Sequence, residues 1–161
     1  MDGVAAGRDT ATDLTEIQDL VRAFFAAFTS GPDSASRLDT LRSLFLPEAV
    51  IIRTCGLEPA VYDVPGFITP RAALLSGDTL IDFKEWELSG RIDVFGDIAH
   101  WFGAYAKKGV QDGEPFTGRG KKSLQFVRTA QGWRISAAAW DDERDGLTVD
   151  DGRDGRDMGQ Q

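Results

Sequence analysis

Three residues of this chain could carry acid–base chemistry, and each stands at or near a predicted strand: His100, Asp141 and Arg53. Histidine is the side chain type that most readily exchanges a proton near neutral pH, and a carboxylate can also give or take one. A guanidinium stays charged and pairs with an anionic oxygen. If the fold brings them into one pocket, they would suit an acidic or carbonyl-bearing molecule, with His100 as the base and Arg53 stabilising the developing negative charge.

Each of these side chains also has a structural interpretation, which the sequence leaves open. His100 can be a hydrogen-bonded wall residue, and Arg53 can belong to an internal ion pair. Asp141 can simply begin the acidic C-terminal stretch, since residues 141–161 contain eight acidic residues. Lys122, on the strand before Asp141, can be solvated at the mouth of a pocket instead of taking part in function.

Composition excludes several classes of protein. Hydrophobic residues make up 42% of the chain and charged residues 27%, which is typical of a soluble globular protein. No apolar run approaches the roughly 20 residues of a membrane span, and no signal peptide begins the chain. The net charge of −8, without a basic stripe, argues against nucleic acid as a partner. One cysteine and one histidine argue against a zinc site, so we expect no metal and no other cofactor, and the lone Cys55 fits a cytoplasmic protein.

The framework of the predicted fold is an antiparallel meander in the second half of the chain. Apolar, β-rich runs at 98–106, 119–128 and 133–140 alternate with turn signals at 107–115 and 129–132. A long strand at 82–95, with a bulge at Gly90, should precede the meander. A shorter strand at 49–54 should pair with residues 59–64 across Gly56.

Apolar residues at helical spacing predict three helices that cover one face of this sheet. The first begins with a capping-box-like Asp13 and Glu16 and ends before Gly31. The second is capped by Ser34 or Ser36 and ends before Pro47, and the third begins at Pro70 and ends at Gly77. The chain should therefore consist of a disordered lead-in at 1–11, one domain at 12–143 and a disordered acidic, Gly-rich tail at 144–161.

The order of these elements resembles the nuclear transport factor 2-like superfamily, in its SnoaL-like or ketosteroid-isomerase-like branch. The resemblance is carried by AAFTSGPD through LRSLFLPEAVI, by VFGDIAHWFGAY and by GRGKKSLQFVRTAQGWRISAAAWDDE, within residues 14–143. It implies an α+β fold, a conical barrel in which a curved, mostly antiparallel sheet wraps around about three N-terminal helices, as in the cystatin-like roll. The superfamily includes isomerases, cyclases, dehydratases, hydrolases and non-catalytic binders, so the fold alone does not decide the function.

Matching the chain to the ketosteroid isomerases places Arg53 where those enzymes have their catalytic Asp. Phe24 and Leu124 stand where their oxyanion hole has a Tyr and a protonated Asp. An arginine cannot abstract a proton at neutral pH, and neither Phe nor Leu donates a hydrogen bond. Steroid isomerisation by that route is therefore excluded. SnoaL-like cyclases are similar in placing an acid–base Asp near Asp141.

The resemblance also implies which side chains face the cone. It places His100 and Phe102 on the concave side, and Lys122, Leu124 and Phe126 on the same side of the next strand. With Phe24 and Phe28 from the first helix, the apolar residues would line a ligand pocket. Trp101 and Tyr105, with Trp140, would then be exposed on the convex face, where they predict a homodimer.

The sequence therefore predicts a domain that binds a hydrophobic, oxygenated or carboxylated metabolite, and it leaves open whether this domain is also an acid–base enzyme. The isomerase, cyclase, dehydratase and hydrolase types all remain open. The alternative is a non-catalytic, homodimeric binding or accessory module with a filled or vestigial cavity. The volume of the cavity discriminates between the two.

Overall fold

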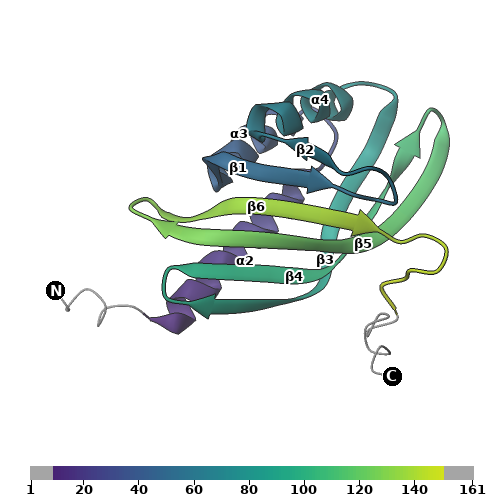
Figure 1. Ribbon diagram of the computed structural model, residues 1–161. Helices are drawn as coiled ribbons and strands as arrows, with labels where there is room; N and C mark the ends of the chain where they lie inside the picture. The colour runs from purple at the N-terminus through teal and green to yellow at the C-terminus, as the bar shows by residue number, and fades with distance from the viewer. Residues whose placement is uncertain (1–8, 151–161) are drawn as a thin grey trace.

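The chain forms one curved six-stranded sheet with three helices on one side of it (Figure 1). The computed structural model describes residues 9–150. The elements, in chain order, are α2 (Thr10–Ala26), α3 (Ser34–Leu44), β1 (Phe45–Arg53), β2 (Ala60–Tyr62), α4 (Val64–Ser76), β3 (Leu80–Phe95), β4 (Ile98–Gln111), β5 (Glu114–Thr129) and β6 (Gly132–Asp142). The predicted α+β architecture is confirmed, although the sheet does not close into a barrel.

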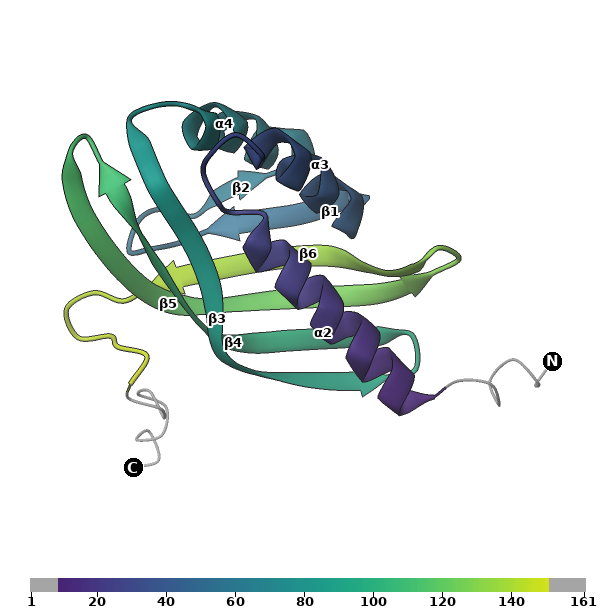
Figure 2. The same cartoon turned by 180° about the vertical axis from the view of Figure 1, so that it is seen from behind.

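The strands lie in the order β2-β1-β6-β5-β4-β3, and every neighbouring pair is antiparallel except β1 and β6. Figure 2 shows α2 crossing the concave side of the sheet, with α3 and α4 beside it at the end that carries β1 and β2. We call this helix-covered side the inner face and the opposite side the outer face. None of the helices within residues 9–150 is long and apolar enough to cross a membrane.

A tight turn at Asp112 and Gly113 sets the register of the two central strands. Both residues have positive φ, 51° and 82°, as a type I′ hairpin turn requires. The turn pairs Gln111 with Glu114, so β4 and β5 extend well beyond the predicted strands. The predicted turn over 107–115 is therefore wrong, because a two-residue Asp-Gly turn leaves its flanking residues free to pair.

Two helices begin earlier than predicted, because aspartates upstream cap them. The side chain of Asp9 accepts a hydrogen bond from the backbone N–H of Ala11, so α2 begins at Thr10. Asp63 caps α4 in the same way through Gly66, and Pro70 lies inside that helix instead of at its start. The predicted starts near Asp13 and at Pro70 are wrong for this reason.

Asp13 anchors the start of α2 to the β5–β6 hairpin instead of capping the helix. Its buried carboxylate accepts a hydrogen bond from Trp133 Nε1 at 3.2 Å and one from Arg128 at 2.9 Å. Glu16 accepts from the backbone N–H of Trp133 at 3.0 Å. These contacts fix the helix on the inner face, where Phe25 packs against Trp101 and Tyr105.

β1 also differs from the prediction, because it begins at Phe45 and includes Pro47. Its pairing with β6 shifts register between Phe45 and Val50. A proline has no N–H for the ladder, and such an irregularity lets a strand contain one. The predicted pairing with the following segment across Gly56 is confirmed by the β1–β2 ladder.

The ends of the domain differ from the predicted boundaries on both sides. Residues 10 and 11, expected in the lead-in, belong to α2. After β6, the backbone N–H of Val149 donates to Glu143, and Arg119 forms ion pairs with both Glu143 and Asp150. Residues 144–150 are therefore tied to the sheet. The rest of the predicted lead-in and tail, 1–8 and 151–161, lies outside the described residues.

Candidate functional site

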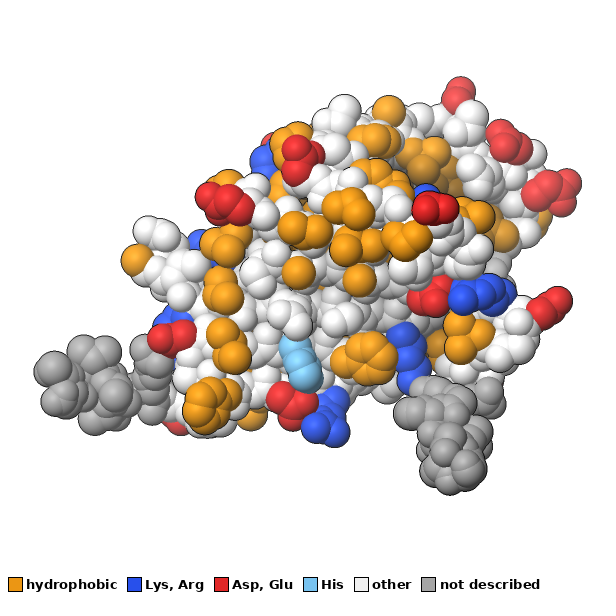
Figure 3. All heavy atoms as spheres, in the orientation of Figure 1, with side chains coloured by type: hydrophobic (Ala, Val, Ile, Leu, Met, Phe, Trp, Pro, Cys, Tyr) orange, Lys and Arg blue, Asp and Glu red, His pale blue; other side chains and the backbone are white. Residues whose placement is uncertain are grey.

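The two faces of β4 are the reverse of the predicted ones. Trp101 and Tyr105 are fully buried against α2, whereas Phe102 is 52% exposed and His100 lies on the outer face. Figure 3 shows the histidine on this face. The prediction that His100 and Phe102 face the cone is wrong, and so is the prediction that Trp101 and Tyr105 lie outside it.

Glycines on neighbouring strands explain why Trp101 takes the inner position. A Cβ at Gly90 would lie 2.2 Å from Trp101 Nε1, so the indole occupies the space that a side chain at Gly90 would need. The indole N–H then donates to Glu87 at 3.1 Å. The predicted bulge at Gly90 is therefore displaced: the register shift lies between Glu87 and Ser89, and Gly90 instead makes room for the indole of Trp101.

The hairpin register contains the signal that sequence reasoning missed. Once Gln111 pairs with Glu114, His100 must pair with Gln125 and Gly103 with Lys122. Residues that pair share a face, and successive residues alternate, so His100 and Lys122 cannot both point inward. A prediction that placed the turn at Asp112 and Gly113 would have put them on opposite faces.

An interior pocket of about 250 Å³ lies between α4 and the bent ends of the long strands. Most of its lining is apolar, from Phe28, Phe67, Leu74, Leu75, Leu80, Phe83, Phe116 and Trp140. Lys122, Glu85 and Tyr105 also reach the lining and are largely buried. Leu74 and Gln111 are exposed and lie at the opening. The pocket therefore has charged groups at its deep end and an apolar wall.

The deep end carries a buried ion pair between Lys122 and Glu85. Lys122 Nζ lies 3.4 Å from Glu85 Oε1, and the two side chains are only 6% and 11% exposed. Burial lowers the pKa of Lys122, although the carboxylate of Glu85 opposes that shift. Within residues 9–150, Glu85 Oε1 has no hydrogen-bond donor in good geometry, so the ammonium is its electrostatic partner. Such a pair can exchange a proton with a bound molecule.

Aromatic rings surround the ammonium of Lys122. Its Nζ lies 4.4 Å from the ring centroid of Tyr105 and 4.8 Å from that of Trp140. The rings of Phe24, Phe25 and Phe28 lie between 5.5 and 5.8 Å away. Ring faces attract a cation and keep water away from it. The rings therefore offset part of the cost of burying the ammonium.

A second polar group lies beside this pair, on β4 and β6. The hydroxyl of Tyr105 donates to Asp142 Oδ1, and Lys107 Nζ lies 3.1 Å from Asp142 Oδ2. Burial and the hydrogen bond to Asp142 raise the pKa of Tyr105 far above its usual value. Burial also acts to raise the pKa of Asp142, but its bonds from Tyr105 and Lys107 outweigh this and lower it. The carboxylate is therefore ionised, and the tyrosine keeps its proton.

Arg71 of α4 adds a cation to the wall of the pocket. Its guanidinium lies 3.9 Å from the ring centroid of Phe67 and within 6 Å of Tyr62 and Trp140 at 5.8 and 5.7 Å. It donates to the carbonyl of Phe67 at 3.0 Å, and among residues 9–150 no carboxylate forms an ion pair with it. Burial lowers its pKa, yet a guanidinium remains charged at neutral pH. This cation can bind an anionic group of a ligand.

Only two of the nine predicted site residues line the interior pocket, Phe28 and Lys122. Phe24, Leu124 and Phe126 are buried in the core. Arg53 is half-buried and donates to the carbonyl of Thr54 at 3.4 Å. It lies at the end of β1, beside Trp140, and does not line the pocket.

Asp141 lies on the outer face, because Asp142 takes the inner position on β6. Asp141 pairs with Lys121 across the sheet and forms an ion pair with Arg144. The hydrogen bond from Arg144 lowers the pKa of Asp141, against a smaller opposing effect of burial. The prediction that Asp141 faces the cone is wrong, and the carboxylate near the cone belongs to the next residue.

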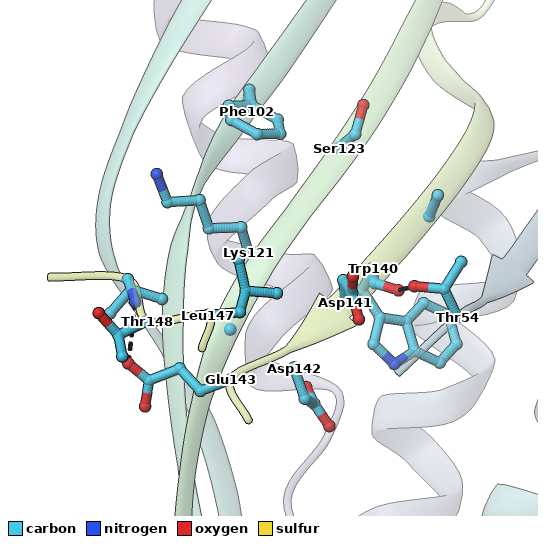
Figure 4. Close-up of a pocket in the computed structure, with 13 residues that line it drawn as sticks. Thr54, Phe102, Lys121, Ser123, Trp140, Asp141, Asp142, Glu143, Leu147 and Thr148 are labelled. Atoms are coloured by element: carbon cyan, nitrogen blue, oxygen red, sulfur yellow. Dashed lines mark hydrogen bonds between the residues drawn. The ribbon is translucent and has the colours of Figure 1, made fainter. Parts of the chain in front are cut away.

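Asp141 instead lines a hollow of about 320 Å³ on the outer face (Figure 4). Phe102, Lys121 and Ser123 form one side of it, and Leu147 and Thr148 of the C-terminal segment form the other. All three carboxylates of its lining, at positions 141, 142 and 143, already form ion pairs, with Arg144, Lys107 and Arg119 respectively. We therefore regard the interior pocket, with its buried charged pair, as the candidate functional site.

The described residues contain no cluster of three or more metal-binding side chains, counting His, Cys, Asp and Glu. Cys55 lies in a left-handed turn after β1, with a φ of 52°. Burial and the nearby Asp142 raise its pKa, so its thiol is protonated and unreactive at neutral pH. The polar chemistry of the interior site thus rests on lysine, arginine, tyrosine and carboxylate groups.

Comparisons with known proteins identify the fold. No protein-family model matches the chain, and no curated protein matches it in sequence. A structure titled as a proposed aromatic ring hydroxylase, from Novosphingobium aromaticivorans, is 21% identical, with a TM-score of 0.67 over 85% of this chain and 93% of its own. An NTF2-like protein with a cystatin-like fold from the same species is 21% identical, with a TM-score of 0.63 over 86% of each chain.

A hexachlorocyclohexane dehydrochlorinase, LinA-type3 from Novosphingobium barchaimii, is also similar in structure. It is 15% identical and has a TM-score of 0.69 over 84% of this chain and 89% of its own. The chain therefore has the nuclear transport factor 2-like fold, with its cystatin-like arrangement of helices and sheet. The predicted resemblance to this superfamily is confirmed at the level of the fold.

Proposed function

We propose that this protein binds a small apolar molecule with an acidic group in the interior pocket, and that Lys122 and Glu85 exchange a proton with it. The observation that carries this proposal is a buried ion pair, 3.4 Å apart, at the deep end of a pocket whose lining is mostly apolar. Burying two charges is expensive, so a pair that stabilised the fold alone could be replaced by apolar residues. Its position on the pocket wall supports a role in function.

The charge balance around the pocket favours an anionic ligand. Lys107, Lys122 and Arg71 supply three positive charges, and Glu85 and Asp142 supply two negative ones. One positive charge is left over, and Arg71 is the cation without a carboxylate partner among residues 9–150. A ligand carboxylate would accept two parallel hydrogen bonds from this guanidinium. The aromatic wall would hold the apolar part of the molecule.

The size of the pocket favours a molecule of one or two rings. Its volume of about 250 Å³ lies just below the range of typical ligand pockets, roughly 300–1,000 Å³. The alternative function, an accessory module with a filled cavity, needs an interior packed by side chains. The open volume supports the binding function over that alternative.

The same site can catalyse proton transfer. In this mechanism the carboxylate of Glu85 takes a proton from the bound molecule, and the ammonium of Lys122 stabilises the oxyanion that forms. Tyr105 stays protonated, because its hydroxyl donates to Asp142. In this proposal Glu85 is the base that was expected of His100, and Lys122 stabilises the oxyanion, as was expected of Arg53. Asp141 takes no part.

A thermal-shift comparison of matched ligands tests the proposal. Single-ring and bicyclic carboxylic acids should raise the melting temperature, and their uncharged primary amides should raise it much less. Arg71→Met should abolish the preference for the acid. Arg22→Met, which removes an exposed arginine of α2, is the matched control and should leave it unchanged. Equal shifts with acids and amides would contradict the proposal.

We further propose that a second copy of the chain covers the outer face. Of the aromatic residues expected there, Trp101 and Tyr105 are buried and Trp140 is half-buried, yet other apolar side chains are exposed on this face (Figure 3). Phe102 and Val50 are 52% and 42% exposed, and Val61 and Ile98 are 67% and 59% exposed. Apolar side chains spread over one sheet face favour an interface between copies.

A further inference from the structure

Besides exchanging a proton, the amine of Lys122 can act as a nucleophile. We infer that Lys122 forms a protonated imine with the carbonyl carbon of an oxo acid, whose carboxylate is held by Arg71. This inference rests on the proposed function, because it needs the ligand to occupy the interior pocket. It adds the class of substrate and a covalent step.

The position of Lys122 favours a nucleophilic amine. The side chain is 6% exposed, but it lines the pocket, so a molecule bound there can reach its amine. A lysine is a nucleophile only when it has lost its proton, and an apolar setting promotes that loss. Glu85, 3.4 Å away, is placed to take the proton.

The aromatic rings around Nζ suit the product as well as the reactant. A protonated imine carries the same single positive charge as the ammonium that it replaces. The rings of Tyr105 and Trp140, at 4.4 and 4.8 Å from Nζ, would stabilise either cation. They also keep water from the imine, and water is the reagent that would reverse its formation.

Imine formation needs no reagent other than Lys122, Glu85 and the oxo acid. The Lys122 ammonium gives one proton to the Glu85 carboxylate, and the free amine attacks the carbonyl carbon to form a C–N bond. A second proton moves from nitrogen to the former carbonyl oxygen, which gives a carbinolamine. Glu85 returns its proton to that hydroxyl, the C–O bond breaks and water leaves. The products are the protonated imine, the Glu85 carboxylate and one water molecule.

Arg71 and Lys122 line the same pocket, and both cations lie beside the ring of Trp140. The guanidinium of Arg71 lies 5.7 Å from the ring centroid of Trp140, and Lys122 Nζ lies 4.8 Å from the same centroid. A compact oxo acid could therefore place its carboxylate at one cation and its carbonyl at the other. The apolar residues of the pocket lining favour an aromatic or branched spacer.

Reductive trapping tests the inference. The protein would be incubated with 4-formylbenzoate and cyanoborohydride, which reduces an imine to a stable amine, and the modified lysine would be identified by peptide mass spectrometry. Benzaldehyde, which lacks the carboxylate, is the matched probe. Lys121 is the matched control residue, because it neighbours Lys122 on β5 and lies on the outer face.

We expect the adduct on Lys122, with trapping by 4-formylbenzoate at least about 10-fold faster than by benzaldehyde, the factor for one charged contact. Lys122→Arg should remove this adduct, and Lys121→Arg should not. Glu85→Gln should slow trapping by about 100-fold, the lower end of the range for a lost general acid–base group. If Lys122→Arg does not fold, protection of wild-type Lys122 by 4-methylbenzoate replaces it as the test.

Adducts spread over surface lysines and unchanged in Lys122→Arg, or unaffected by 4-methylbenzoate, would overturn the inference. The proposed function is tested separately by the binding of 4-methylbenzoate, which has no aldehyde. If this acid binds and no Lys122 adduct forms, the imine is wrong and the binding function stands. If it does not bind, the proposed function fails as well.

Discussion

The buried pair of Lys122 and Glu85 makes a strong prediction about stability. Lys122→Met keeps a flexible side chain of similar length among the aromatic rings, where a thioether packs well. It leaves the Glu85 carboxylate, 11% exposed, without its cation. Removing one partner of a buried ion pair costs about 3–5 kcal/mol. For a chain of this size we expect the melting temperature to fall by roughly 6–20 °C.

The second half of the prediction is the double variant. Lys122→Met combined with Glu85→Met removes both charges. Replacing a buried ion pair with apolar residues is neutral or stabilising by about 1–4 kcal/mol. The free energy of unfolding of the double variant should therefore equal or exceed the wild-type value.

Urea unfolding at neutral pH, followed by circular dichroism, measures the four free energies of this double-mutant cycle. The coupling between the two sites should be at least about 2 kcal/mol, well above the usual error of additivity. If the single variant lost less than about 1 kcal/mol, or if the two losses simply added, the ion pair would not be the buried, coupled unit that we describe.

Three further predictions concern other parts of the molecule. In Tyr62→Phe, Tyr105 is the one remaining tyrosine. Its raised pKa stabilises the fold below about pH 10, and this stabilisation is lost at higher pH, so tyrosinate absorbance should appear only as the circular dichroism of the folded protein is lost. Tyrosinate absorbance at about pH 10 in a folded protein would contradict this. Truncation after Glu143 should lower the melting temperature by about 2–4 °C relative to truncation after Asp150, because the intervening segment contacts the sheet; equal melting temperatures would refute that. Wild type should be a dimer by light scattering and Phe102→Asp a monomer, whereas a monomeric wild type would contradict a paired outer face.

The fold was predictable because its signals are local. The short turn at 129–132, the apolar spacing of α2 and the β-branched strands each agree with the final architecture. Helix starts were less predictable, because Asp13 looks like a cap in the sequence but serves as a buried acceptor for Trp133. That role depends on a contact over more than a hundred residues, which local rules cannot reveal.

The site was less predictable, because the alternation of side chains along a strand does not show which of its two faces points inward. On β4, His100 with Phe102 and Trp101 with Tyr105 both form plausible inner faces. On β3 the alternation is misleading, since Trp86 and Leu88 are 37% and 46% exposed while the side chain of Glu85 is only 11% exposed. A charged residue on an inner face breaks the hydrophobic pattern, and such exceptions are expected where a site is built.

The central claim is that Arg71 binds the acidic group of a ligand in the interior pocket. Isothermal titration calorimetry of one aromatic acid and its primary amide, against wild type and Arg71→Met, measures this contact directly. A hydrogen-bonded charge contact contributes about 1.5–3 kcal/mol, so wild type should bind the acid roughly 10–150-fold more tightly than the amide. Arg71→Met should bind the two alike. If the preference for the acid survived in Arg71→Met, or if wild type showed none, the site would not work as proposed.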